Sequence, residues 1–317
     1  MRKLLSLLCI LVLYLYLHSC QDIKCRTPNL GELENPISIS YAHNKLAIVS
    51  SPEDVLEWCS SYLTIYNVGW DEKTSAVVIS PSKIVPLSGK VAGDVTYLEK
   101  ISSFIVGVRD KKLLEIVNIK NELSLGKISV ELNDISAIDT YENVINILSS
   151  FEKRISIIKY NEKYDFERYK NIGIKTNEKK PKHILSSKDE EQYTFNLNNI
   201  KGKPYLSEQY VRFATSTANN TVISSFIFAE CLRQEEDCSS NIDNYFYSSI
   251  TKDYKANDIF IDERYAAVLT EGGLEVFTQE KIIHKNNMIK SGILYMKDDF
   301  LFVLNSNNLY AVRLDKI

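Results

Sequence analysis

The feature that most constrains the fold is a recurring pair of short apolar runs joined by a tight turn. Between Asn143 and Asn161, an apolar run over 144–148 and a run rich in β-branched residues over 155–160 flank the polar turn 151–154. Two such runs around a tight turn predict a β-hairpin, because they are too short for an ordinary helix. An isolated hairpin is marginal in water, so other strands must cover it.

The same pattern occurs seven times along the chain. The paired runs are 46–50 with 62–68, 104–108 with 113–119, 144–148 with 155–160, 183–187 with 193–200, 210–215 with 222–228, 266–270 with 274–278, and 300–304 with 309–314. They recur about every 42 residues, the length of a four-stranded repeat. Before five of the hairpins, a turn dipeptide starts a further apolar strand, at Asn35, Gly93, Asn133, Asn257 and Ser291. We assign these strands to the innermost position. The chain is therefore predicted to be all-β, a seven-bladed β-propeller of four-stranded blades, with six blades as the alternative.

The N-terminus has the layout of a secretory signal. Arg2 and Lys3 precede an apolar core over 4–17, which is short for a membrane span. The sequence LHSC over 17–20 resembles the lipobox of bacterial lipoproteins, which implies that residues 1–19 are removed and that Cys20 becomes the lipidated mature N-terminus. An ordinary cleaved signal and a retained anchor are the alternatives. Residues 20–36 would then form a tether or closing segment, and residues 37–317 the propeller.

The cysteines fit an oxidising compartment outside the cytoplasm. One of the six leaves with the signal and Cys20 would carry the lipid, so Cys25, Cys59, Cys231 and Cys238 remain. Nearness in sequence favours the disulfides Cys25–Cys59 and Cys231–Cys238 among three possible connectivities. Metal binding is the rival interpretation, but the cysteines lack CxxC spacing and nearby histidines. No metal site is predicted.

Composition and motifs argue against several classes of function. Loss of residues 1–19 removes two basic side chains and changes the formal charge from −3 to −5, and no basic stripe with interleaved aromatics indicates nucleic-acid binding. The chain contains no HExxH, GxSxG, GxGxxG or P-loop motif. We therefore predict no catalytic residue and no cofactor. A catalytic site assembled from distant blades remains open, because its residues need not be close in sequence.

Four residues are candidates for partner binding. Asp94, Asp134 and Asp258 occupy the second position of turns that lead into innermost strands, so their carboxylates are expected to ring one mouth of the central channel. The alternative is that each closes its own turn by accepting backbone hydrogen bonds. Trp58, in the insertion 51–61, is either an aromatic anchor for a partner or a packing residue beside the Cys25–Cys59 bridge.

The repeats also resemble a known group of proteins. Segments such as FIVGVRDKKLLEIVNI and LFVLNSNNLYAVRL are similar to the repeats of extracytoplasmic bacterial propellers of the LVIVD type. This resemblance implies a propeller used for binding. We expect a non-catalytic, lipid-anchored protein-binding module of the bacterial envelope, an adhesin or an assembly scaffold on the outer membrane, or a secreted one. A propeller hydrolase or lyase, and a propeller that binds a small ligand or carbohydrate at the channel mouth, are the alternatives.

The predicted docking face follows from the repeat. The turns that lead into the innermost strands and the loops inside the hairpins share one face, so that face should carry the four candidates. Loops on a rigid scaffold are where binding groups concentrate. The predicted partner is another protein, and the membrane is reached through the lipid alone.

Overall fold

The computed structural model describes residues 25–54, 57–160, 166–173, 185–186, 192–193, 200–206, 210–227, 246–278 and 281–317. This part of the chain is all-β, with seven antiparallel sheets and no α-helix. The first three sheets each have four strands: β1 (Pro36–Ala42), β2 (Lys45–Ser50), β3 (Tyr62–Asp71) and β4 (Ala76–Pro86); β5 (Ala92–Leu98), β6 (Ser103–Val108), β7 (Leu113–Asn118) and β8 (Ser124–Ser129); β9 (Ala137–Tyr141), β10 (Val144–Ser149), β11 (Arg154–Tyr160) and β12 (Phe166–Gly173).

The remaining four sheets differ in size. They are β13 (Leu185–Ser186) and β14 (Gln192–Tyr193); β15 (Ile200–Leu206), β16 (Tyr210–Ser216), β17 (Thr221–Ile227) and β18 (Phe246–Lys252); β19 (Asp258–Ile261), β20 (Ala266–Thr270), β21 (Gly273–Phe277) and β22 (Ile282–Asn286); and β23 (Ile293–Lys297), β24 (Phe300–Asn305) and β25 (Asn308–Arg313). In every sheet, strands that follow one another in sequence are hydrogen-bonded neighbours.

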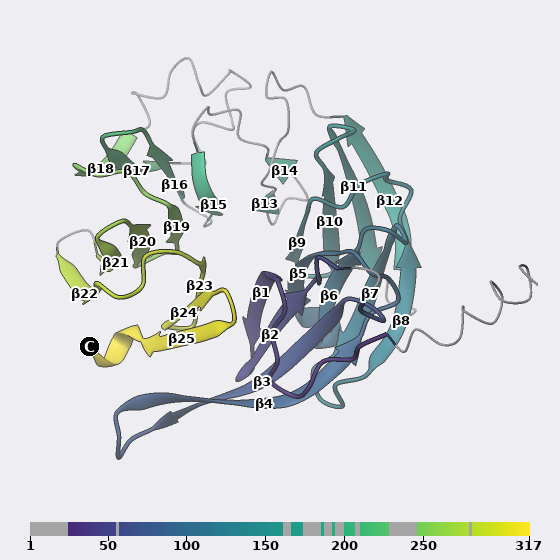
Figure 1. Cartoon of the computed structure of the whole chain (residues 1–317). Helices are drawn as coiled ribbons and strands as arrows, with labels where there is room; N and C mark the ends of the chain where they lie inside the picture. The colour runs from purple at the N-terminus through teal and green to yellow at the C-terminus, as the bar shows by residue number, and fades with distance from the viewer. Residues whose placement is uncertain are drawn as a thin grey trace, which may run out of the picture.

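The sheets are arranged radially, with the first strand of each nearest the centre (Figure 1). First strands contact one another in chain order, from β1 to β5, β9, β13, β15, β19 and β23, and β23 also contacts β1. The hydrophobic core therefore lies between the faces of adjacent sheets. One cluster joins the β1–β4 and β5–β8 sheets through residues such as Val49 and Val106, and another joins the β1–β4 and β23–β25 sheets through Tyr41 and Phe302.

The predicted hairpins are present wherever the structure describes both strands. Six of the seven pairings match in position, for example β10 with β11 and β24 with β25. Of the fourth predicted hairpin, the structure describes only the short pair β13 and β14. Because β13 contacts the first strands β9 and β15, it occupies the position of a first strand in its own sheet. The strand expected from Asn133 begins instead at Ala137, and directly before it the Arg109 Nε–H donates to the Ile135 carbonyl at 2.9 Å.

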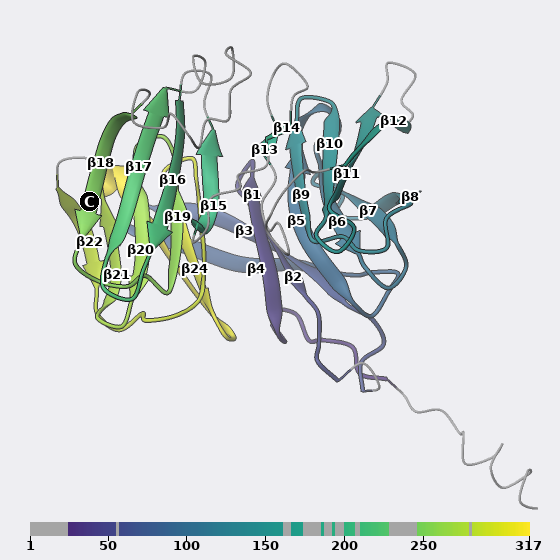
Figure 2. The ribbon, with the colours of Figure 1, turned by 90° about the horizontal axis from the view of Figure 1, so that it is seen from above.

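Two opposite faces arise because each sheet is a simple meander (Figure 2). One face carries the loop 51–61, the turns 109–112 and 150–153, and the loop 287–292; we call it the stapled face. Its loops are joined: the Ser51 N–H donates to the Asn35 carbonyl at 3.2 Å, and the Ser61 N–H donates to the Gly89 carbonyl at 2.8 Å. The loops inside the hairpins and the turns that lead into the first strands therefore share this face, as expected.

Candidate functional site

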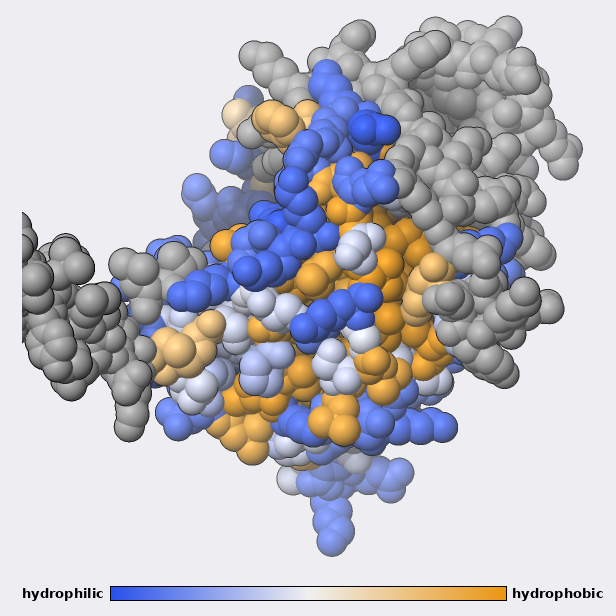
Figure 3. All heavy atoms as spheres, turned by 90° about the vertical axis from the view of Figure 1, so that its right-hand side faces the viewer, coloured by the Kyte–Doolittle hydropathy of each residue, from blue (hydrophilic) through white to orange (hydrophobic). Residues whose placement is uncertain are grey.

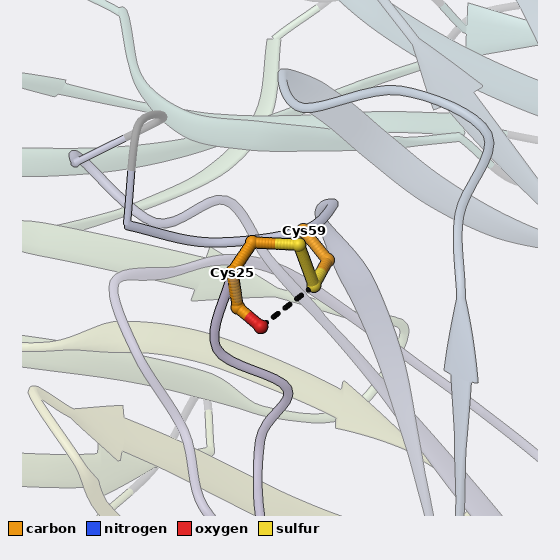
Figure 4. Close-up of a disulfide and its surroundings, with 2 residues drawn as sticks. All are labelled: Cys25 and Cys59. Carbon is orange, nitrogen blue, oxygen red and sulfur yellow. Dashed lines mark hydrogen bonds between the residues drawn. A yellow bond between two sulfur atoms is a disulfide. The ribbon is translucent and has the colours of Figure 1, made fainter. Parts of the chain in front are cut away.

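The loop 51–61 is fixed to the start of the described chain by a disulfide. Cys25 and Cys59 are bonded, with Cα atoms 4.8 Å apart, so this predicted disulfide is present (Figure 4). Beside it, the Arg26 N–H donates to the Glu57 carbonyl at 2.7 Å and the Cys59 N–H donates to the Arg26 carbonyl at 3.1 Å. The bridge and these hydrogen bonds fix residues 57–59 of the loop to residues 25–26.

Trp58 is buried in this arrangement. Only 3% of the residue is exposed, its ring stacks on Tyr62 with centroids 5.8 Å apart, and the Arg26 guanidinium lies 4.6 Å from the ring centroid. A ring covered on both sides by its own chain has no surface to offer a partner. The expectation that Trp58 is an exposed anchor is therefore wrong, and its alternative, packing beside the disulfide, describes its position.

Asp94 ties three sheets together at the centre of the molecule. Its carboxylate accepts hydrogen bonds from the Ser38 hydroxyl on β1 at 2.5 Å, from the Val95 N–H at 2.9 Å, and from the Ile138 N–H on β9 at 2.9 Å. The Val95 N–H also donates to the Ser38 Oγ at 3.2 Å. Ser38 on β1 therefore accepts from the next first strand, β5, as Asp94 on β5 accepts from β9. These contacts use most of the acceptor capacity of the carboxylate.

Asp258 and Asp134 differ in position. Asp258 repeats the Asp94 contact, because its carboxylate accepts from the Leu294 N–H of the next first strand at 3.3 Å. Asp134 lies ahead of β9 and accepts from the Ser136 hydroxyl, so it does not occupy the equivalent place. The position that corresponds to Asp94 in the third sheet is Ala137, directly before Ile138. The three carboxylates therefore do not form a set of equivalent positions.

The most exposed large apolar side chains in the described chain lie on the stapled face. Phe151, in the turn between β10 and β11, is 77% exposed, and Met288, in the loop between β22 and β23, is 88% exposed. The sequence pattern missed both. The signal that points to Phe151 is an aromatic residue directly before three charged residues, Glu152, Lys153 and Arg154, between two apolar runs.

The surroundings of Phe151 are held by polar contacts between two sheets. The Lys112 Nζ donates to the Asn133 Oδ1 at 2.8 Å, and the Asn133 amide donates to the Glu152 carboxylate. The Glu152 N–H in turn donates to the Ser149 Oγ at 3.1 Å. An apolar ring on a fixed turn with a charged rim has the composition of a protein-docking anchor, since such anchors are aromatic side chains surrounded by polar residues.

A second apolar area lies on the side of the molecule. Figure 3 shows hydrophobic side chains among charged ones on the side of the molecule that carries β8. Leu123 and Leu125, at the start of β8, are each more than half exposed. These residues belong to an outer strand rather than to either face, and they provide a control for the Phe151 turn.

The face opposite the stapled face contains a polar hollow. Its volume is 290 Å³, and its lining residues are His43, Lys45, Ser102, Ile119 and Lys120. Two of these side chains already have carboxylate partners: the Lys45 Nζ lies 2.5 Å from a Glu122 oxygen, and the His43 Nε2 lies 3.2 Å from a Glu99 oxygen. Part of the positive charge at the hollow is therefore already balanced by carboxylates beside it.

The pKa of Glu122 is lowered within this group. Burial acts to raise it, but hydrogen bonds from Lys45 and Ser82 outweigh burial and favour the carboxylate. The pKa of Glu275 is lowered in the same way. Burial acts to raise it, but hydrogen bonds from Lys285 and Tyr254 outweigh burial. Both glutamates join strands or loops that are distant in sequence, which is a structural use of charge.

Within the ranges that the structure describes, no three His, Cys, Asp or Glu side chains lie close enough to hold a metal ion. Nor does any helix in those ranges have the length and apolar character to cross a membrane. Cys20, Cys231 and Cys238 lie outside the described residues, so their predicted roles stay predictions.

Comparison with known proteins identifies the fold. No family model matches the sequence, and no curated protein matches it. Among solved structures, the chain is similar to Hsv2 of Kluyveromyces lactis with loop 6CD replaced by a Gly-Ser linker, at a TM-score of 0.55, 12% identity, and coverage of 87% of this chain and 90% of that one. It is also similar to Hsv2 of Kluyveromyces marxianus, at a TM-score of 0.54, 11% identity, and coverage of 88% and 92%. Hsv2 is a β-propeller protein, so this chain shares a propeller-like all-β fold.

Proposed function

We propose that the chain is a seven-bladed propeller that binds another protein through its stapled face. The blade number rests on seven sheets whose first strands contact one another in chain order, with β23 returning to β1. A seven-bladed ring of this kind would be a rigid scaffold that displays loops at fixed positions.

The observation that carries the binding proposal is the exposure of Phe151 and Met288 on one face. Exposing a large apolar side chain to water is unfavourable by about 1.5–3 kcal/mol relative to burying it, and that free energy becomes available when a partner covers it. The backbone at Phe151 is also held by its turn, because the Glu152 N–H donates to the Ser149 Oγ, so no loop has to be ordered on binding.

The proposal includes an extracytoplasmic address. The Cys25–Cys59 disulfide supports it, since disulfides persist mainly in oxidising compartments. The lipobox-like sequence at Cys20 supports attachment to a membrane by lipid. The propeller would then act as an adhesin or scaffold held at the envelope surface.

The test is capture of partners from native envelope by the folded mature domain. Phe151→Ala should weaken capture of the same partner at least tenfold, whereas Leu125→Ala, which removes an exposed side chain of similar size from β8, should leave it unchanged. Equal capture by the parent and by Phe151→Ala, or loss only in Leu125→Ala, would remove the stapled face as the docking site.

A small-ligand function is the second candidate, and the hollow lined by His43, Lys45 and Lys120 favours it. Its cationic groups and the Ser102 hydroxyl suit a small anion. Lys120→Gln would abolish binding of such an anion without affecting capture of a protein on the stapled face.

A further inference from the structure

The last sheet has one strand fewer than its neighbours. Five sheets have four strands, whereas the sheet of β23, β24 and β25 ends at β25, and in the part of the chain that the structure describes no strand pairs with the outer side of β25. Its sequence is that of a third strand, NLYAVR, with apolar residues on both faces. The third strands β7 and β21 are almost entirely buried, but β25 is only half-buried along most of its length.

The register shows which backbone groups are free. Asn305 pairs with Asn308 across a two-residue turn, so these residues exchange hydrogen bonds, as do alternate pairs such as Val303 with Tyr310. The N–H and C=O groups of Leu309, Ala311 and Arg313 therefore point away from β24. From Leu309 to Arg313, these residues present an edge of about 14 Å that can accept another strand.

The neighbouring sheet shows what such an edge normally binds. Leu274 and Val276 on β21 hold the positions that correspond to Leu309 and Ala311, and they pair with Asn286 and His284 of the fourth strand β22. In all five four-stranded sheets the fourth strand is antiparallel to the third. The missing element is thus an extended strand antiparallel to β25.

Two walls flank this edge. On one side, Leu309 and Ala311 belong to the same apolar cluster as Val77 and Ile79 of β4. On the other, Tyr310 and Val312 cluster with Ile283, and the Tyr310 hydroxyl lies 2.9 Å from the His284 Nε2. Figure 1 shows the β3–β4 ribbon running on past β25. Because the β3–β4 ribbon extends beyond the edge of β25, a single extended segment can reach that edge more easily than a sheet of a second propeller can.

We propose that β25 binds an extended segment of a partner protein by β-strand addition. The segment would have about five residues and carry apolar side chains at two successive positions, because both walls are apolar. The inference rests on the proposed function in one respect. With Cys20 as the lipidated first residue, only five residues precede Cys25, and a five-residue strand would use all of them and leave none to link it to Cys25.

The probe is a fluorescein-labelled peptide copy of residues 281–287, the fourth strand of the adjacent sheet, titrated by fluorescence anisotropy against the full mature chain. Saturable binding is expected. Ala311→Pro removes an outward N–H that β24 does not use, so it should weaken binding at least tenfold while the protein stays folded. The matched control is Lys127→Pro on β8, the exposed fourth strand of a complete sheet, which should bind the peptide like the parent.

Hydrogen exchange provides a second measurement that does not depend on a variant. The amides of Leu309, Ala311 and Arg313 should exchange quickly in the free chain and slowly with the peptide. Protection in the free chain at every concentration would mean that the chain covers its own edge, and protection that rises together with a dimer would assign the edge to a second copy; either result overturns the proposal. Peptide binding unchanged in Ala311→Pro would overturn it too. Phe151→Ala should leave peptide binding intact, so failure of this edge and failure of the stapled face are separable.

Discussion

Removing the Cys25–Cys59 disulfide is the most direct test of how the chain holds its stapled face. The two cysteines are 34 residues apart, and the loop that they close includes β1 and β2. In the chain-entropy description, closing a loop of this length restricts the unfolded state by about 4 kcal/mol at 25 °C. The double variant Cys25→Ser/Cys59→Ser should lower the free energy of unfolding by about that amount.

The loss should begin locally. Trp58 packs beside the bridge, and the backbone hydrogen bonds between Arg26 and its neighbours Glu57 and Cys59 remain in the variant. They no longer have a covalent bond to fix them, so the segment should open before the sheets unfold. Urea unfolding followed by the fluorescence of Trp58, in a Trp70→Phe background that leaves one tryptophan, would report this opening.

The comparison variant is Cys231→Ser/Cys238→Ser. Those cysteines are seven residues apart, so if they are paired the same description gives about 2.5 kcal/mol. The longer loop should therefore cost more when it is opened. A change of less than about 1 kcal/mol in Cys25→Ser/Cys59→Ser would refute the entropic reasoning, because local contacts alone would then hold the segment.

Three further predictions follow from single residues. Cys20→Ala cannot carry the lipid, so it should stay unprocessed and leave the membrane fraction. Cell fractionation and migration on a denaturing gel would show the two changes. Glu115→Ala should lower the free energy of unfolding by about 2 kcal/mol, because the buried carboxylate accepts from both the Ser88 N–H at 2.9 Å and the Ser88 hydroxyl at 2.6 Å, and urea titration would measure the loss. The lowered pKa of Glu122 means that its ion pair stabilises the fold above the ordinary carboxyl pKa of 4.5 and is lost as pH falls through the lowered value, so Glu122→Gln should show a shallower loss of stability between pH 5 and pH 2 than the parent.

The repeat was predictable from sequence because hairpins are local. Val144–Ser149 and Arg154–Tyr160 are adjacent in the chain, and their apolar runs and turn suffice to specify the pairing. Strand ends were less predictable. β3 and β4 extend to Asp71 and Ala76 along the neighbouring sheet, and contacts with that distant sheet, such as Arg313 over the Trp70 ring, favour the extension. No local pattern encodes such a contact.

The candidate site was predictable only in its face. The order of turns in a meander places loop 51–61 and the turns before the first strands together, whatever their residues. The exposure of a given side chain depends on what packs against it in three dimensions. Trp58 is covered by Arg26 and Tyr62, whereas Phe151, in a turn between two buried strands, is 77% exposed.

The aspartates show why a binding role should be sought in side chains that the fold does not use. Asp94 connects β1, β5 and β9 through three hydrogen bonds. At the corresponding position of β1 the residue is Ser38, whose hydroxyl oxygen accepts from the Val95 N–H of β5. A carboxylate that already accepts several hydrogen bonds would have to give them up to bind a cation or a basic group, at a cost of about 1–3 kcal/mol for each donor left unpaired. Phe151 gives up only water when a partner covers it. The free energy of docking is therefore more readily obtained at the turns of the stapled face than at the inner strands that those turns connect.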